Sequence, residues 1–273
     1  LRGVGGGPGD EMPTNVLYMG LAAAVMILFA AAMVSTGTMS VPEGILVAIV
    51  GTLWLAIAGL IVAQATGMTD ISPLSGMSLI GVTILFFLTA GNITASIVLG
   101  VAICIGIGQC GDMMTDLKSG HLVGAIPRKQ QLAQLAVGWI GVPIAVGAVF
   151  LFWETPGFGP GMDLGAPQGQ ALEAVIASLS SGDVPLDKYV SGAAIGAGLG
   201  AFPISGLGVL VGLAMYLPFY VTATYGIGCV TSIVLRRRLG AQWFGATLVP
   251  VAAGFIIGEA LPALVMSIIK AAQ

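Results

Sequence analysis

The stretch GILVAIVGTLWLAIAGLIVA, residues 44–63, contains no charged residue. An uninterrupted apolar run of roughly 20 residues has the length of an α-helix that crosses the hydrocarbon core of a bilayer. The whole chain shares this character, because 57% of its 273 residues are hydrophobic and only 8% are charged. A soluble domain has about 25% charged residues. We therefore expect an integral membrane protein.

Apolar segments of this kind recur along the chain, and the stretches between them hold nearly all of the charge. They lie at about 15–35, 43–65, 75–90, 92–111, 131–153, 190–206, 208–234 and 244–268. The segments lack the period-2 alternation of strands and are rich in Ala, Leu and Gly, so we predict an all-α fold. The predicted architecture is a polytopic transmembrane helical bundle of about eight membrane segments. It occupies residues 15–273, and residues 1–14 are interpreted as a loop internal to a longer chain.

Two short clusters of basic residues indicate the orientation of the chain. The stretch 112–130 contains Lys118, Arg128 and Lys129, and 235–243 contains three consecutive arginines, whereas 154–188 is long and mostly acidic. Because cytoplasmic loops carry an excess of Lys and Arg, the two basic stretches are predicted to be cytoplasmic. The acidic stretch is then an extracytoplasmic loop.

Two of the apolar segments are short or interrupted. The segment 75–90 follows the Ser72-Pro73 break, and 190–206 is rich in glycine and ends near Pro203. Two apolar segments, 190–206 and 208–234, lie between the outside acidic loop and the second, cytoplasmic basic stretch. Because the chain must cross the membrane an odd number of times between them, one of the two segments should be broken or re-entrant. Glycine makes 190–206 the better candidate. Ordinary helix packing at Gly and Pro explains both segments equally well.

Glu259 is the candidate site residue with the clearest physical argument. It lies within an otherwise uncharged span, 248–268, where an ionised carboxylate costs several kcal/mol. We expect it to face the bundle interior and to bind a proton, a cation or a substrate amine, or to pair with a buried base. A protonated glutamate that only packs between helices is the alternative.

Asp112 and Asp116 are the next candidates. They are four residues apart and would share one face if the helix before them continues, with Lys118 and Arg128 available as partners. The alternative is a solvated loop whose charges only set the topology.

Uncharged polar residues complete the candidate substrate or proton pathway: Ser72, Ser75, Asn92 and Tyr216. Asn92 begins an apolar segment, so it either caps a helix or lines a path. Tyr216 is explained equally well by anchoring at the membrane interface.

Several classes of function lack their sequence signatures. The net charge of −3 and the confinement of Lys and Arg to two clusters argue against binding nucleic acid. The chain contains neither an HExxH nor a Walker motif, it has one histidine, and its three cysteines show no CxxC spacing. We therefore expect no catalytic residues, no metal site and no cofactor.

Four stretches together resemble a known family. GDMMTDLKSG (111–120) with GAIPRKQQ (124–131) is similar to the hallmark D-x-x-x-D-L-K-x-G … G-A-x-P-R-K-Q-Q of the oligopeptide transporter family, especially its prokaryotic and yellow-stripe-like branch. SPLSGM (72–77), YLP (216–218) and GFIIGEAL (254–261) resemble further elements of that family in the same order. The resemblance begins near residue 43 and implies that the chain is roughly the second half of a family member.

The resemblance implies cation-coupled, usually proton-coupled, uptake of oligopeptides, peptide derivatives or metal chelates by a multi-pass protein of the cell membrane, which in a prokaryote is the inner membrane. The expected partners are the substrate, protons, the lipid bilayer and the missing N-terminal half of the same chain. Whether the protein forms a homo-oligomer stays open. Two other functions also stay open, namely a membrane-embedded enzyme and a non-transporting accessory subunit.

Overall fold

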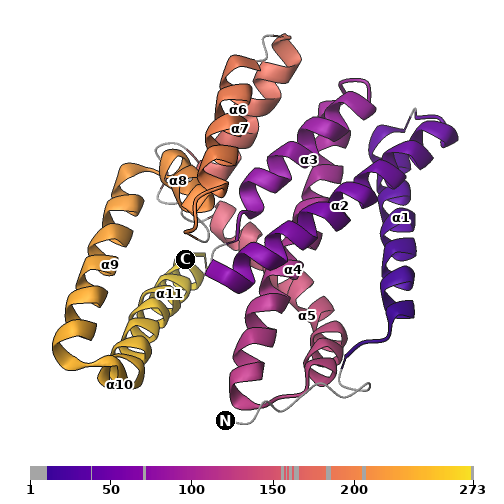
Figure 1. The fold of residues 1–273 in the computed structure, drawn as a ribbon. Helices are drawn as coiled ribbons and strands as arrows, with labels where there is room; N and C mark the ends of the chain where they lie inside the picture. The colour runs from indigo at the N-terminus through magenta and orange to yellow at the C-terminus, as the bar shows by residue number, and fades with distance from the viewer. Residues whose placement is uncertain are drawn as a thin grey trace. The chain divides into compact units, whose positions relative to one another are not determined.

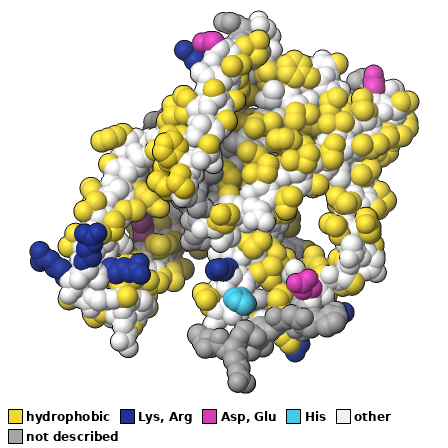
Figure 2. Space-filling model, viewed as in Figure 1, with side chains coloured by type: hydrophobic (Ala, Val, Ile, Leu, Met, Phe, Trp, Pro, Cys, Tyr) yellow, Lys and Arg dark blue, Asp and Glu magenta, His cyan; other side chains and the backbone are white. Residues whose placement is uncertain are grey.

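The computed structural model describes residues 11–37, 39–69, 72–154, 157, 159, 162, 166–182, 186–204 and 207–271. All regular structure within these residues is helical, which confirms the predicted all-α fold. Contacts divide the chain into two units. The first comprises Leu1–Trp139 with Ala171–Gly212, and the second comprises Ile140–Gln170 with Leu213–Gln273. Figure 2 shows hydrophobic side chains over most of the visible surface, with charged side chains in a few small groups.

Six helices in the described part of the chain are long and apolar enough to cross a membrane. They are α1 (Thr14–Thr36), α2 (Val41–Thr69), α4 (Ile93–Val123), α5 (Pro127–Glu154), α9 (Phe219–Leu239) and the continuous helix of α10 (Ala241–Trp243), the π-helical stretch η1 (Phe244–Leu248) and α11 (Val249–Ala271). Figure 1 labels the α-helices among them, and η1 follows α10 and precedes α11 along the chain. A polytopic membrane bundle is therefore confirmed, whereas the predicted count of about eight segments is not.

The difference in count comes from two shorter helices, and a third predicted segment is divided by a proline. The predicted segment 75–90 is α3 (Leu74–Leu88), and 190–206 is replaced by α7 (Leu186–Gly200), each of 15 residues. At 1.5 Å per residue, such a helix spans about 22 Å, which is less than the roughly 30 Å of the hydrocarbon core. The predicted segment 208–234 is split at Leu217-Pro218 into α8 (Leu207–Tyr216) and α9, since proline cannot continue the preceding helix.

The first unit is built on the mutual packing of α1, α2, α3 and α4. One face of α4 carries Leu99, Ile103 and Ile107, each at most 1% exposed, at the four-residue spacing of a buried helical stripe. Lipid is as apolar as these side chains, so close van der Waals packing between helices must supply the stability. Glycine permits that packing: a Cβ added at Gly100 would lie 2.2 Å from Cγ2 of Val82 on α3.

The turns of the first unit are closed by local hydrogen bonds. The backbone N–H of Ser40 donates to the carboxylate of Glu43 at 2.9 Å, which is one half of a capping box at the start of α2. Asn92 caps α4 by accepting a hydrogen bond from the N–H of Ala95 at 3.0 Å. These bonds satisfy backbone groups that the helix ends would otherwise leave unpaired.

The region 154–188, predicted as one long loop, contains the helix α6 (Pro167–Ser181). Its apolar residues Leu172, Val175, Ile176 and Leu179 follow helical spacing, and the last two are buried against Val82 and Phe86 of α3. The connection between α5 and α7 therefore contains a short helix. Because acidic and small polar residues surround α6, the sequence did not indicate this short amphipathic helix.

The second unit contains the hairpin in which α9 is followed by α10, η1 and α11 (Figure 1). Three arginines, 236–238, fill the last turn of α9, where positive charge is favourable at the negative end of the helix dipole. Gly240, at φ +88°, makes the turn, and the guanidinium of Arg236 lies 5.9 Å from the centre of the Phe244 ring. The second basic stretch is thus the corner of a helical hairpin.

Candidate functional site

The hallmark stretch 112–130 forms a helical corner rather than an open loop. α4 continues through both aspartates to Val123, and Gly124 ends it in the left-handed conformation at φ +78°. α5 begins at Pro127, whose fixed φ and missing N–H suit the first position of a helix. The helix therefore continues past Asp112, and residues 112–123 are helical.

Two glutamines of α5 hold this corner closed against Asp116 of α4. The side-chain amide of Gln130 donates to the backbone carbonyl of Asp116 at 3.0 Å, and the amide of Gln134 donates to its carboxylate. Gln130 and Gln134 are one helical turn apart and so reach the same neighbour. Gly120 makes room for this contact, since a Cβ there would lie 2.1 Å from Oε1 of Gln130. We call residues 116–134 the α4–α5 corner.

The charges of the α4–α5 corner and its surroundings are exposed. Asp112, Lys118, Arg128 and Lys129 all lie at the surface. The suggested pairing of the aspartates with Lys118 or Arg128 is not found, because the carboxylate of Asp116 accepts from Gln134 instead.

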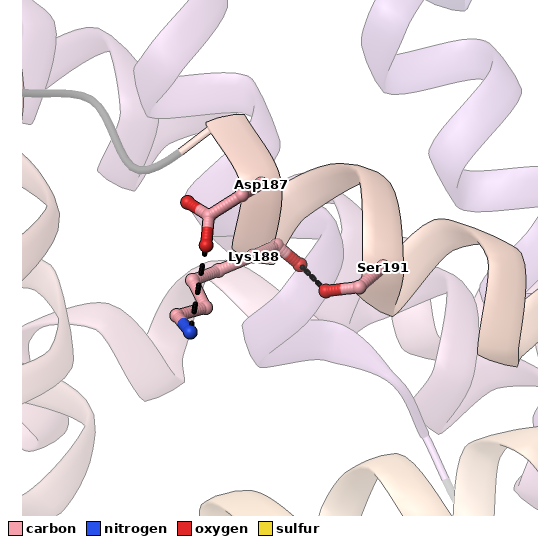
Figure 3. A network of polar contacts seen from close by, with 3 residues as sticks. All are labelled: Asp187, Lys188 and Ser191. Carbon is pink, nitrogen blue, oxygen red and sulfur yellow. Dashed lines mark hydrogen bonds and ion pairs between the residues drawn. The ribbon is translucent and has the colours of Figure 1, made fainter.

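Among the described residues, one ion pair meets the distance criterion, between Asp187 and Lys188 at 3.4 Å (Figure 3). Both side chains are more than 70% exposed, and the hydroxyl of Ser191 donates to the carbonyl of Lys188 one turn further along α7. An exposed pair of sequence neighbours contributes little to stability. The pair lies in the first turn of α7 and does not connect α7 to another helix.

Ser72 lies at the break between α2 and α3, where it meets two residues of neighbouring helices. A Cβ added at Gly111 of α4 would lie 3.2 Å from Oγ of Ser72 and 3.5 Å from Oγ1 of Thr66 on α2. Neither hydroxyl has a hydrogen-bond partner among the described residues. Ser75 is half-buried in the first turn of α3. The structure thus brings Ser72 to α4 beside Thr66, a residue that the sequence did not single out.

Asn92 belongs to a polar cluster at the turn between α3 and α4. Besides its capping bond, its carbonyl accepts from the hydroxyl of Ser96 at 2.6 Å. The hydroxyls of Ser96 and Thr89 are 3.0 Å apart, and both residues are buried. Of the two roles considered for Asn92, the geometry supports the cap of a helix.

Glu259 and Tyr216 belong to none of the clusters described so far. Tyr216 is the last residue of α8, and its side chain is not among those described. Glu259 is exposed on α11, where the described side chains are exposed except for the half-buried Leu264 and Ser267. The expected burial of Glu259 is therefore not found, because none of the described helices of its own unit covers that face of α11.

An apolar groove of about 750 Å³ lies beside the α4–α5 corner in the first unit. It is lined by α1, α2, α4 and α5, and its few polar groups include Gln131 and Cys110. The Oε1 atom of Gln131 is buried without a partner among the described residues. In the described part of the chain, no three His, Cys, Asp or Glu side chains lie together as metal ligands would.

Two curated proteins resemble the chain. A Haemophilus influenzae protein whose name is given as "Putative oligopeptide transporter" is 26% identical over 97% of this chain and 49% of its own length. A Saccharomyces cerevisiae protein of the same description is 39% identical over 95 residues, which are 33% of this chain and 13% of the yeast protein. The chain thus spans about half the length of the bacterial relative. No solved structure matches it.

The sequence model of the OPT oligopeptide transporter protein family matches residues 9–270, which include every helix described above apart from the last residue of α11. The α4–α5 corner, built from the hallmark residues of the resemblance, falls within that match. The chain belongs to the OPT oligopeptide transporter family.

Proposed function

We propose that this chain is the later half of a secondary active transporter that takes up oligopeptides, peptide derivatives or metal chelates across the cell membrane. The observation that carries the proposal is the family match over residues 9–270. Six helices of membrane-spanning length and the names of the two relatives support it. The driving force is a cation gradient, and we propose protons as the coupling ion.

The α4–α5 corner is the proposed inner gate. It carries exposed basic residues, so the positive-inside rule places it at the cytoplasmic face. Gln130 and Gln134 hold α5 to α4 through two hydrogen bonds to Asp116, and two such bonds can break without unfolding a helix. Opening and closing of a gate needs two arrangements that differ by a few kcal/mol.

Glu259 is the proposed proton-binding residue. An ionised carboxylate within an apolar membrane span is costly, so the residue needs a partner or a function. The other half of the protein is the proposed cover, because α11 offers an apolar face that its own unit leaves exposed. This arrangement puts the substrate path between two halves, as in many secondary transporters.

The test is uptake by the full-length protein in proteoliposomes. Labelled short peptides and a labelled metal chelate are offered separately, with and without an inward proton gradient. The proposal expects gradient-driven accumulation of at least one class, and Glu259→Gln should reduce it strongly or shift its pH profile. The matched control is Glu173→Gln on the exposed face of α6. An unaltered Glu259→Gln protein would favour a role of this chain as an accessory subunit.

A further inference from the structure

Hydroxyl groups in the helices of this protein usually bond to their own helix. Donation to the carbonyl four residues earlier is the ordinary arrangement for Ser and Thr in a helix interior. It is found at Ser78, Thr83, Thr115, Ser180, Thr224 and Ser267, with oxygen–oxygen distances of 2.7–3.2 Å. A buried hydroxyl that does not make this bond needs a different explanation.

Thr66 is such a hydroxyl. The residue is 7% exposed in the last turn of α2, and its Oγ1 is buried with no hydrogen-bond partner among the described residues. A buried donor or acceptor without a partner costs about 1–3 kcal/mol. Thr66 also has a second hydroxyl of the same kind near it, since Oγ of Ser72 is likewise buried and unpaired in the described part of the chain.

Gly111 brings the two hydroxyls toward one point. The Cβ that an alanine would add there would meet Oγ of Ser72 at 3.2 Å, Cγ1 of Val62 at 3.3 Å and Oγ1 of Thr66 at 3.5 Å. The oxygens therefore approach the backbone of α4 from two different segments, the end of α2 and the residues just before α3. A larger side chain at this position would crowd both hydroxyls.

The surroundings of these oxygens favour a cation of single charge. Thr66 lies in the last turn of α2, where the helix dipole presents its negative end. Hydroxyl and carbonyl oxygens suit hard cations, whereas calcium is usually bound with carboxylates among its ligands. Neither Thr66 nor Ser72 carries charge, and a methyl group of Val62 lies near the same point, 3.3 Å from the Cβ that Gly111 lacks. In other transporters the ends of interrupted helices coordinate sodium ions in this manner.

We propose that Thr66 and Ser72 bind a sodium ion between α2 and α4, at the break that separates α2 from α3. The site deepens the proposed function, on which its role in transport rests, by adding a sodium ion to the cations that the transporter uses. Ion binding would fasten the end of α2 to α4.

The experiment measures sodium binding rather than transport. The full-length protein is purified in detergent without sodium, and its melting temperature is followed as sodium chloride replaces choline chloride at constant ionic strength. A ligand that binds only the folded state raises this temperature with concentration. The wild type should show a saturable rise, and Thr66→Val and Ser72→Ala should each raise the half-saturating sodium concentration at least about tenfold, since one oxygen ligand is lost.

Two control variants separate loss of the sodium ligand from loss of any hydroxyl and from poor folding. Thr83→Val removes a hydroxyl that is satisfied by Leu79, so it should keep the wild-type sodium response. Thr66→Ser keeps the oxygen and should bind sodium if Thr66→Val does not, even where the valine variant folds poorly. The absence of a sodium-specific rise in the wild type, or wild-type binding in both Thr66→Val and Ser72→Ala, would overturn the site. Sodium binding without any peptide uptake would leave the site standing and remove the proposed function.

Discussion

The side-chain amide of Gln134 donates a hydrogen bond to the carboxylate of Asp116 across the turn between α5 and α4. Gln130, one turn earlier, bonds to the backbone carbonyl of the same aspartate, and Gly120 leaves the space that its amide occupies. Residues of the family hallmark are therefore explained by a physical role, that of fastening two membrane helices at a tight corner. The proposed gate is built from these contacts.

Breaking the corner should cost a small, measurable amount of stability. We expect the double-mutant cycle of Asp116→Asn and Gln134→Leu to give a coupling energy of about 1 kcal/mol, because one hydrogen bond at a partly exposed site is lost. The measurement is equilibrium unfolding in mixed detergent. Lys118→Met, at an exposed position of the same helix, should change stability by less than about 0.5 kcal/mol. A coupling energy of zero would show that the contact does not hold the corner.

Gly100 should tolerate no side chain. An alanine there would place its Cβ 2.2 Å from Cγ2 and 3.4 Å from Cα of Val82, so α3 and α4 would have to separate. Overpacking of this kind costs about 1–3 kcal/mol. Gly100→Ala should therefore lower the melting temperature, and Val82→Ala in the same chain should restore part of it. Gly138→Ala, with nothing within 4 Å, is the matched control and should be close to neutral. Equal melting temperatures for the two alanine variants would contradict the close approach of α3 and α4.

Much of the fold could be predicted from the sequence because the apolar bilayer requires long uncharged helices, with the charged residues between them. The uncharged run 44–63 lies within α2, and the basic stretches coincide with helix corners at Gly124 and Gly240. Period and charge could not reveal that α4 continues beyond Asp112, since charged residues are equally compatible with a loop and with a helix outside the bilayer.

Other features depend on contacts between distant segments. α6 is stabilised by burial of Ile176 and Leu179 against α3, which a search for long apolar runs does not detect, although their spacing with Leu172 and Val175 is helical. Thr66 became a candidate only through its distance from Gly111. Glu259 was expected to face the interior of a helix bundle, but the described helices of its own unit leave it exposed.

α6 should be held in place by its two buried residues. Ile176→Asn introduces a polar side chain where Val82 and Phe86 lie, and an amide buried without a partner costs about 1–3 kcal/mol. We expect the amides of α6 to lose protection from hydrogen exchange in this variant, while those of α4 keep theirs. Ala177→Asn, on the exposed side of the same helix, should leave the exchange unchanged. Unaltered protection in Ile176→Asn would mean that α6 does not depend on α3.

Asn92 should act as a helix cap and not as a substrate ligand. Asn92→Asp keeps the oxygen that accepts from Ala95 and should retain the stability of the wild type. Asn92→Ala removes it and should cost about 1 kcal/mol in unfolding. Uptake by properly folded Asn92→Ala should keep the wild-type KM. An increase in KM with unchanged stability would instead place Asn92 on the substrate path.

The central claim is that this chain forms half of a transporter in which substrate and proton move together. The most direct measurement follows luminal pH in proteoliposomes of the full-length protein after a transported peptide is added outside, with no gradient imposed. We predict that the lumen becomes acidic as the peptide enters, and that Glu259→Gln abolishes or markedly reduces this change. Entry of the peptide at the wild-type rate with no change in luminal pH would contradict proton coupling.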